Sequence, residues 1–420
     1  MTGGAGAALR GLTWDHPRGY VVLDALAADA GGTSAGGTSV RWDRQPLEGF
    51  ESRPLRTLAD DYDLVILDHP GLGEAIRDGA LRPLDAVLSA AELTACADVS
   101  AGRSYPGYQL GGRQWALPVD AAAQVSVVRP DLLAERPATW ADARRTARTR
   151  PTAICLGGPH ALLMFSAICV ALGAPPAAPG AGADTGADTG ANTGGAAGTS
   201  GPPGGHGRFV DPGAGAEAAA IMADLLAHAD PVLAGQNPIA VLNAMAAPGG
   251  PAYCPLVYGY ITYQRPRPGA AALAAFDAPS GPGGIGSVLG GTGIAVTRSC
   301  RDLAAARSLL LTLVSPDVQV RRYAELGGQS ADRRAWRDPA ADERAGGFYS
   351  ATRATIEAAW VRPRFAGYVE FQSAASAALR AGLLAGEPAG ALVSQVNERY
   401  AVAERAHAAG GERAATARSV

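Results

Sequence analysis

The sequence contains no lysine, and all 36 of its basic residues are arginine. This absence excludes mechanisms that need a lysine amine, including Schiff-base catalysis, pyridoxal phosphate enzymes and the P-loop of nucleotide hydrolases. Cationic binding must therefore come from guanidinium groups. The chain also lacks a basic excess, since its formal net charge is -3. We expect no nucleic-acid partner, because proteins that bind nucleic acid carry a basic surface.

Long apolar segments are also missing. No uninterrupted apolar run reaches the roughly 18 residues that a transmembrane helix needs, because Pro, Gly, Ser or His interrupts each one. Residues 1–20 show neither the basic start nor the apolar stretch of a signal peptide. As encoded, the chain is therefore expected to be cytoplasmic, and an extracytoplasmic location would require a misassigned start codon.

Cysteine is scarce, and its pattern excludes several kinds of site. The five cysteines are odd in number and widely spaced, which is typical of reduced thiols in a core and not of a disulfide framework. Their spacing suits no metal, and we expect neither a metal nor a cofactor. A GxSxG elbow and a reactive-cysteine signature are absent as well, so no catalytic residues are predicted. The cysteines are Cys96, Cys155, Cys169, Cys254 and Cys300.

The composition is that of a globular protein with one unusual segment. Hydrophobic residues make up 47% of the 420 positions, enough for roughly two or three folding units. Residues 174–207 consist mostly of Gly, Ala, Pro, Ser, Thr and Asp, with the quasi-repeat GADT, GADT, GANT. Such a segment buries too little to offset its ordering entropy, so we expect a disordered surface insertion without function. Residues 409–420 are expected to be a frayed tail.

Apolar runs that alternate with helical spacing predict an α/β protein. Residues 62–67 (YDLVIL) form the clearest strand, of the kind buried in parallel sheets. The pair Gly111 and Gly112 predicts a hairpin, and residues 287–296 (SVLGGTGIAV) predict a loop that feeds a strand. Further strands are expected at 8–13, 40–42, 125–128 and 252–263, and helices at 19–30, 89–97, from 140, 216–229, 240–245, 303–314 and through most of the remainder.

Two Asp-His pairs follow predicted strands. Trp14, Asp15 and His16 come after the first strand, and Asp68 and His69 after the third. Carboxyl ends of parallel strands meet at one edge of a sheet, where α/β proteins bind ligands. The pairs would then offer a polar rim for hydroxyl groups or an amine, and Trp14 a flat apolar face. Alternatively, the carboxylates cap the helices that follow and the imidazoles are hydrogen-bonded locally.

A carboxylate and three tyrosines are further candidates. Asp120, in LPVD, would accept sugar hydroxyls or an ammonium group, with capping as the alternative. Alternation places Tyr258 and Tyr260 on one face of the aromatic strand and Tyr253 near its start. Phenolic rings suit a cleft that is partly apolar and partly wet, although a plain core strand is equally consistent. Gln329, in GGQ, is also a candidate.

The last candidates lie in a glycine-rich loop and near a proline. Gly291 and Thr292 would bring backbone amides close to a ligand, although close packing alone explains glycines there. Trp360, Arg362 and Arg364 surround Pro363, which stiffens a segment holding two guanidinium groups beside an indole. Such a cluster would bind a carboxylate or phosphate, or stack on a ring. The alternative is a pair of solvated surface arginines.

The order of these motifs resembles a known family. WDHP, DHPG, GGRQWALPVDAAAQ, YCPLVYGYITY, GGTGIAV, SPDVQ and ELGGQ occur in this sequence. Together they resemble the maltose-binding-protein-like extracellular solute-binding proteins of ABC importers, over essentially the whole chain apart from the Gly-rich insertion. The resemblance implies a two-lobed type II periplasmic-binding-protein-like fold, with a ligand cleft between the lobes and release by hinge opening.

The resemblance also implies boundaries, partners and a location. Lobe one would comprise residues 1–117 and 285–326, and lobe two residues 118–284 and 327–408. The partners would be a small-molecule solute and ABC permease subunits, the protein would be a monomer, and the location would be extracytoplasmic. The family normally carries a signal peptide, often with a lipid-anchored cysteine, and the N-terminal residues here match neither pattern.

Three functions are compatible with this sequence. In the first, the chain captures a small polar solute, either a sugar or a sugar-like or carboxylated metabolite, for an ABC importer. In the second, it is a cytoplasmic enzyme on the same fold, in which the Asp-His pairs perform acid/base or metal-assisted chemistry. In the third, it is a cytoplasmic sensor that reports lobe closure to a regulator.

Overall fold

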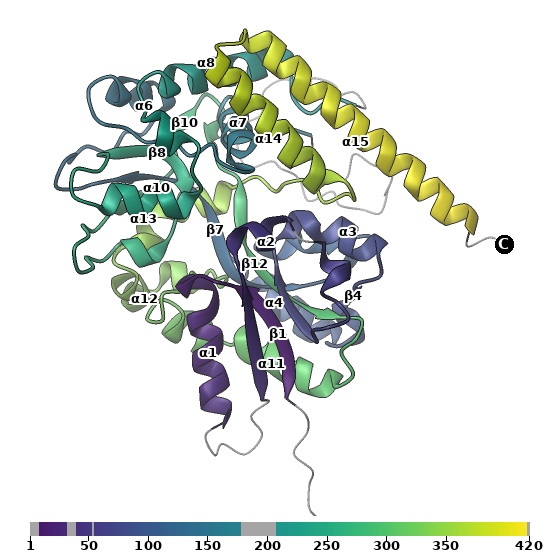
Figure 1. Ribbon diagram of the computed structural model, residues 1–420. Coiled ribbons are helices and arrows are strands. Elements are labelled where there is room, and N and C mark those ends of the chain that lie inside the picture. Colours follow the sequence, from purple (N-terminus) through teal and green to yellow (C-terminus); the bar gives the residue numbers. More distant parts are fainter. Residues whose placement is uncertain (1–7, 32–38, 53, 178–206, 418–420) are drawn as a thin grey trace, which may run out of the picture. The chain divides into compact units, whose positions relative to one another are not determined.

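The computed structural model describes residues 8–31, 39–52, 54–177 and 207–417. The chain forms two compact units and passes between them three times (Figure 1). Unit 1 comprises residues 1–121 and 290–345, and unit 2 comprises residues 122–289 and 346–420. The sequence placed residues 327–345 in lobe two, whereas the structure places them in unit 1. They belong there because Gln329 and Ser330 are hydrogen-bonded to elements of that unit.

Unit 1 is built on a mixed sheet whose strand order is β2-β1-β3-β12. Strands β1 (Leu9–Trp14), β2 (Val40–Gln45) and β3 (Leu64–Leu67) are parallel, and β12 (Leu289–Thr297) lies antiparallel to β3. All four residues of β3 are buried, which explains the unbroken apolar run predicted to be a strand. Strand β4 (Leu81–Arg82) also pairs with β12.

Local sequence signals start the helices of unit 1. Helix α1 (Pro17–Gly31) begins after two residues that follow β1, and its first residue is a proline, which is preorganised for a first helical turn. Helix α4 (Ala90–Asp98) begins with a capping box between Ser89 and Glu92. The other helical segments of the unit are α2 (Leu47–Ser52), Leu55–Thr57, His69–Gly71, α3 (Leu72–Arg77), Leu84–Ala86, α5 (Ser104–Gly107), α11 (Leu303–Leu313), the π-helix Asp317–Arg322, Ala335–Arg337 and α12 (Pro339–Arg344).

The predicted Gly-Gly hairpin is confirmed in unit 1. Strands β5 (Gln109–Leu110) and β6 (Arg113–Gln114) pair antiparallel. Between them, Gly111 and Gly112 have φ angles of 59° and 69°, the left-handed region that favours glycine. The hairpin leads directly into β7 (Leu117–Val128), a strand whose twelve residues are all buried and which carries the chain from unit 1 into unit 2.

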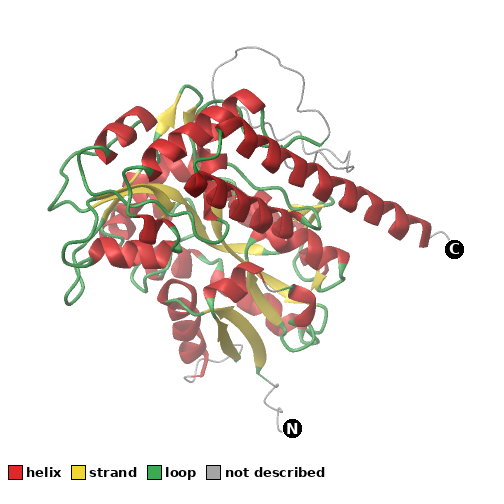
Figure 2. Ribbon diagram, turned by 45° about the horizontal axis from the view of Figure 1, so that its top comes forward, coloured by secondary structure: helices red, strands yellow, loops and turns green. Residues whose placement is uncertain are grey.

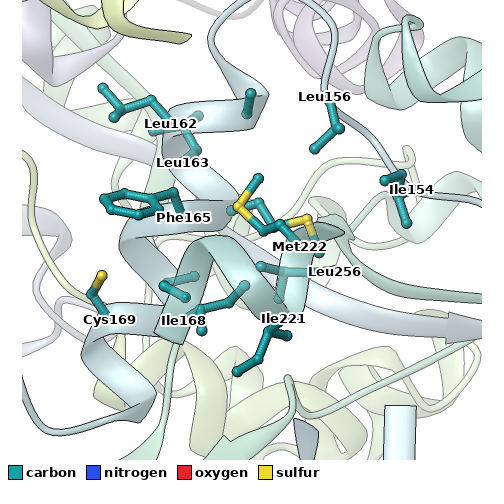
Figure 3. Close-up of a cluster of buried hydrophobic side chains, with 14 of the residues drawn as sticks. Ile154, Leu156, Leu162, Leu163, Phe165, Ile168, Cys169, Ile221, Met222 and Leu256 are labelled. Carbon is teal, nitrogen blue, oxygen red and sulfur yellow. The ribbon is translucent and has the colours of Figure 1, made fainter. Parts of the chain in front are cut away.

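Unit 2 surrounds one helix that is apolar on every side. Helix α7 (His160–Ala171) has buried side chains around its whole circumference, and Leu162, Phe165 and Ile168 pack with side chains from other elements in Figure 3. Close packing extends to its backbone, because a Cβ on Gly286 would lie 2.0 Å from the Ala167 carbonyl oxygen. Only glycine fits that approach.

The sheet of unit 2 pairs β7 with β8 (Tyr253–Tyr258) and β9 (Ala274–Phe276), both antiparallel. Helices α14 (Tyr368–Ala385) and α15 (Ala389–Ala417) contact each other, and α15 runs toward the C label in Figures 1 and 2. The remaining elements are α6 (Trp140–Ala147), α8 (Pro212–Leu226), α9 (Pro231–Ala234), α10 (Pro238–Ala246), Ile261–Tyr263, β10 (Ser280–Gly281), β11 (Gly284–Ile285) and α13 (Phe348–Ala358).

Three predictions about local structure need correction or fall outside the described residues. Most of the predicted glycine loop, from Leu289 onward, belongs to β12, where Gly293 makes room for Tyr108: a Cβ there would lie 2.7 Å from the phenol ring. Residues 409–417 of the predicted frayed tail are helical, since their alanine-rich sequence continues α15. The predicted insertion at 174–207 falls almost entirely on residues 178–206, outside the described part.

The cysteines are free thiols, as predicted. Four of the five are buried and Cys96 is half-buried. Burial raises the pKa of Cys254 to about 12 and that of Cys300 to about 11, so both remain protonated and unreactive near neutral pH. Within the described residues, the helices are too short or too polar for any of them to span a bilayer.

Candidate functional site

The register of the parallel strands brings the two Asp-His pairs of unit 1 to one sheet edge. Strand β1 pairs with β3 so that Leu12 faces Val65. Because the strands are parallel, the residues that follow their carboxyl ends, Asp15–His16 and Asp68–His69, lie at the same edge of the sheet. The sequence-based expectation that both motifs follow adjacent strands at the same edge agrees with this geometry.

Trp14 is packed inside unit 1. Its indole is 3% exposed and lies nearly parallel to the His16 ring, with centroids 5.1 Å apart and planes 9° apart. The Phe50 ring stacks at 5.8 Å, and the Arg18 guanidinium lies 5.9 Å from the indole centroid. Gly19 is required beside it, because a Cβ there would lie 2.2 Å from the indole nitrogen. The half-exposed rings of this stack are His16 and Phe50, whereas Trp14 is buried.

Local contacts orient His16 and Asp15. The Arg18 backbone N–H donates to His16 Nδ1 at 3.2 Å, so the imidazole acts as a cap on the first turn of α1. This is the local hydrogen bonding that the alternative interpretation predicted. Asp15 remains exposed, and its carboxylate lies 3.9 Å from Arg44, which also pairs with Asp24 at 2.5 Å.

Asp68 and His69 form a closed local arrangement at the end of β3. Asp68 Oδ1 accepts the backbone N–H of His69 at 2.8 Å and lies 3.1 Å from His69 Nδ1. The carboxylate therefore caps the 3-10 turn that follows. The His69 ring is buried edge-on against Tyr108, at 6.1 Å, and the Tyr108 hydroxyl donates to the Leu67 carbonyl at 3.2 Å. Asp68 keeps part of its side chain exposed.

Asp120 is paired with a residue that sequence reasoning missed. Arg18 Nε donates to Asp120 Oδ2 at 2.9 Å, and its Nη2 donates to Oδ1. Both side chains are buried. The Gln329 backbone N–H donates to the same carboxylate at 3.2 Å. Since the partners are 102 positions apart, no spacing pattern could have revealed this pair.

The glycine candidates of unit 1 lie within a strand. Gly291 has a φ of 97°, a backbone conformation that favours glycine, and the Thr292 side chain is buried in β12. The positive φ of Gly291 is by itself a reason for a glycine at this position. Gln329 is fully buried, and its Nε2 donates to the Ala121 carbonyl at 3.2 Å.

The three tyrosines of unit 2 do not share one strand face. Strand β8 ends at Tyr258, and Tyr260 lies beyond it with its ring edge-on to Tyr263 at 6.2 Å. The expected alternation stops there because a 3-10 turn begins at Ile261. Tyr253 is completely buried in the core. The Tyr258 hydroxyl donates to the Leu289 carbonyl at 3.4 Å.

Trp360, Arg362 and Arg364 are all buried, so the surface-arginine alternative is wrong. The indole belongs to the apolar core of unit 2, and residue 360 forms a parallel bridge with Val288. Arg362 Nη1 donates to Gln372 Oε1 at 3.3 Å, and its Nη2 donates to the Leu289 carbonyl at 3.4 Å. Burying a guanidinium requires such polar partners.

His160 is a second residue that the sequence did not reveal. It occupies the start of α7 in unit 2, and its ring meets Tyr258 edge-on at 5.9 Å. Burial, together with the positive charge of Arg362, lowers the pKa of His160 to about 3. The imidazole is therefore neutral at physiological pH. A single histidine at the start of an apolar helix gives no sequence signal that it is buried beside an arginine.

Comparison with known proteins adds the fold context. The sequence matches no protein-family model and no curated protein. Among solved structures, the maltose-bound MalE3 of T. maritima is similar with a TM-score of 0.73 and 17% identity, covering 94% of this chain and 98% of that one. An ABC transporter solute-binding protein of Thermotoga lettingae TMO, bound to α-D-tagatose, gives a TM-score of 0.73, 15% identity, and coverage of 94% and 99%.

A third similar structure is the GacH receptor of Streptomyces glaucescens GLA.O, solved unliganded and with acarbose. Its TM-score is 0.71 at 15% identity, with 95% of this chain and 98% of that chain covered. Matches of this length confirm the fold that the sequence resemblance implied. The chain has the two-lobed α/β fold of the sugar-binding proteins of ABC transporters.

Proposed function

We propose that this protein binds a small polar solute, a sugar or a polyol, and delivers it to the permease subunits of an ABC importer. The observation that carries the proposal is the fold, which is shared over at least 94% of the chain with proteins solved with maltose and with tagatose. The strand-end polar groups of unit 1 support it, because carboxylates and an imidazole with exposed atoms suit a hydroxylated ligand.

The residues we assign to solute binding come from both units. In unit 1, Asp15, His16 and Asp68 keep exposed atoms at one sheet edge. Carboxylates accept hydroxyl protons there, and the imidazole offers a ring face. The remaining candidates are Trp14, His69, Asp120, Gly291 and Thr292 of unit 1 and Tyr253, Tyr258, Tyr260, Trp360, Arg362 and Arg364 of unit 2; those among them that are buried would support the exposed groups rather than provide contact area.

We propose binding without reaction, because the proteins of this fold that were solved with maltose and with tagatose are described as binding proteins. In this chain both Asp-His pairs also have structural tasks: His16 Nδ1 accepts the Arg18 N–H, and Asp68 Oδ1 accepts the His69 N–H. If His16→Ala and His69→Ala retained affinity for a metabolite but abolished its turnover, the enzyme alternative would replace this proposal.

The proposal is tested by thermal-shift measurements with maltose, D-tagatose, ribitol and acarbose, and with amino acids and dicarboxylates as contrasting classes. A ligand at about 100 times its Kd adds roughly 2.7 kcal/mol to stability. We expect a rise in Tm with at least one sugar or polyol. Shifts with amino acids or dicarboxylates alone would contradict the proposed solute class.

Matched variants localise the site. Asp68→Asn should weaken the shift produced by the active sugar, because an amide accepts fewer hydroxyl protons than a carboxylate. Asp61→Asn, at an exposed carboxylate of the same unit, is the control and should leave the shift unchanged. Equal effects of the two variants would remove Asp68 from the site. An importer collects solute outside the membrane, so we also propose an exported form, to be checked from the upstream reading frame.

A further inference from the structure

The three passages of the chain between the units differ in how they are held. The passages lie at residues 121/122 in β7, at 289/290 in β12 and at 345/346. The first two fall within strands, and the third falls at a glycine pair. In a hinged protein, the residues at such points decide which parts move rigidly and which parts bend.

At the first passage, three side chains of unit 1 hold three consecutive residues of β7. Gln319, from the π-helix, donates to the Val119 carbonyl at 3.1 Å. Arg18, from α1, binds the Asp120 carboxylate through two nitrogens. Gln329 exchanges hydrogen bonds with Ala121: its backbone carbonyl accepts the Ala121 N–H at 3.1 Å, and its Nε2 donates to the Ala121 carbonyl at 3.2 Å. Ala121 is the last residue of unit 1 on this strand.

Arg18 is the charged member of this group and links it to the sheet edge of unit 1. The guanidinium lies over the Trp14 ring, and the backbone N–H of the same residue binds His16. The bidentate pair with Asp120 fixes both distance and angle, which a single hydrogen bond would not. One residue therefore ties the end of β1 to the point where β7 leaves the unit.

At the second passage, unit 2 holds the end of β12 in a corresponding way. Leu289 is the last residue of unit 2 on this strand. Its N–H donates to the Trp360 carbonyl at 2.8 Å, and its own carbonyl accepts from Arg362 Nη2 and from the Tyr258 hydroxyl, both at 3.4 Å. Arg362 is in turn held by Gln372. A buried arginine again binds the residue next to the unit boundary.

The third passage is built differently. Gly346 and Gly347 have φ angles of 65° and 80°, which favour glycine. Phe348, directly after them, is buried in unit 2. Two adjacent glycines offer the backbone more conformations than any other pair. The third passage is thus the place where backbone rotation costs least, and the strand passages are the places where side chains fix the chain.

We propose that Arg18 and Arg362 are positioning residues for solute capture. Each fixes, within its own unit, the strand end through which the chain continues into the other unit. They act through β7 and β12, so their loss widens the range of arrangements of the two units. The apparent affinity for a solute falls in proportion to the population of the binding-competent arrangement. Only this affinity effect rests on the proposed function.

A distance measurement tests the proposal without a solute. Spin labels are placed on unit 1 at Asp61→Cys and on unit 2 at Val232→Cys, both exposed positions, in a background with Cys96→Ala. The other four cysteines are buried and would label poorly. Pulsed electron resonance then gives the distribution of distances between the labels in Arg18→Met, Arg362→Met and the unsubstituted background.

Arg129→Met is the matched control. Arg129 is also a buried arginine, with Nε and Nη2 bonds to Asp131 at 2.8 Å and 2.6 Å and a bond from Nη1 to the Met245 carbonyl at 2.9 Å. It follows the opposite end of β7, well inside unit 2. Its loss also removes a buried guanidinium with carboxylate and carbonyl partners, but leaves both unit boundaries intact.

We expect a broader distance distribution for Arg18→Met and for Arg362→Met than for the background, and an unchanged one for Arg129→Met. If Arg18→Met does not fold, Arg18→Met with Asp120→Leu removes the buried charge and gives the same readout. Unchanged widths in the two boundary variants, or equal broadening in Arg129→Met, would overturn the proposal. The proposal would also be overturned if a boundary variant lost the thermal shift with maltose or tagatose while its distance distribution kept its width. If the unsubstituted background shows no thermal shift with either sugar, that result counts only against the proposed function.

Discussion

The two buried arginines at the unit boundaries differ in what they bind. In unit 1, Arg18 binds the Asp120 carboxylate, and the two side chains form a buried ion pair. In unit 2, Arg362 donates to an amide oxygen and to a backbone carbonyl, both neutral. Removing one member of an ion pair leaves a buried charge, whereas removing a donor to neutral groups leaves only unsatisfied dipoles. We therefore expect substitution of the two arginines to lower the free energy of unfolding by different amounts, although both lie at a unit boundary.

The largest expected effect is that of Arg18→Met. Losing one partner of a buried ion pair costs about 3–5 kcal/mol, because Asp120 would remain charged without compensation. Arg362→Met should cost about 1–3 kcal/mol, the range for losing hydrogen bonds such as those that it donates to the Gln372 amide and the Leu289 carbonyl. Urea unfolding followed by circular dichroism measures both differences in the free energy of unfolding.

The second substitution separates charge from packing. In Arg18→Met with Asp120→Leu, no buried charge remains at this site, and most of the lost stability should return. The comparison between the units fails if Arg362→Met costs as much as Arg18→Met, or if the double variant is no more stable than the single one. Either result would mean that packing, not charge compensation, distinguishes the two sites.

Acid should affect unit 2 through His160. Its pKa is about 3 in the folded protein, against an ordinary value near 6.5, so between these values the unfolded chain binds one proton more than the folded one. The free energy of unfolding therefore falls as the pH drops through this window, by up to about 1.4 kcal/mol per pH unit from this residue. His160→Gln should reduce that slope, as measured by urea unfolding between pH 6.5 and pH 4.

The matched control for this experiment is His228→Gln, which changes an exposed histidine of the same unit. We expect a clear change of slope for His160→Gln only. An equal change in both variants would show that burial beside Arg362 has no special effect on His160. It would also weaken the contrast between unit 1, where the buried Arg18 is paired with a carboxylate, and unit 2, where a neutral His160 lies near the buried Arg362.

Much of the fold could be predicted because its signals are local. The LVIL part of the run YDLVIL is buried on both faces as β3, and the Gly-Gly pair forms its hairpin because both residues adopt positive φ. The capping boxes before α4 and α6 follow Ser-x-x-Glu and Thr-x-x-Asp patterns that can be recognised in the sequence. Even the Asp-His pairs are positioned by a rule that depends only on parallel strand order.

The environment of the candidate residues could not be predicted, because it depends on pairs far apart in the chain. Asp120 was expected to meet a ligand, but its partner Arg18 lies 102 positions earlier. Arg362 and Arg364 were weighed against solvated surface residues, yet both are buried, and burial follows from packing among α14, the end of β12 and the Trp360 segment. In these cases the residue type identified side chains with polar partners, but the sequence did not show whether they are buried or which residues they bind.

The smallest effect is expected from replacing residues 178–206 with a flexible linker of about eight residues. The two ends of this segment already meet, since the Ala177 N–H donates to the Phe209 carbonyl at 2.9 Å. Helix α15 binds the residues that follow the segment: Asn397 Oδ1 accepts the N–H groups of Phe209 and Val210, and Glu404 accepts that of Gly207 at 2.7 Å.

Because folded elements of unit 2 fix both ends, the replacement acts mainly through loop closure. Each halving of a flexible loop is worth about 0.6 kcal/mol, so a gain near 1 kcal/mol in the free energy of unfolding is expected, with no change in the sugar-induced thermal shift. Asn397→Ala should cancel this gain in the free energy of unfolding, because it removes the hydrogen bonds to the N–H groups of Phe209 and Val210. A loss of more than about 2 kcal/mol on replacement, or a lost thermal shift, would contradict this expectation.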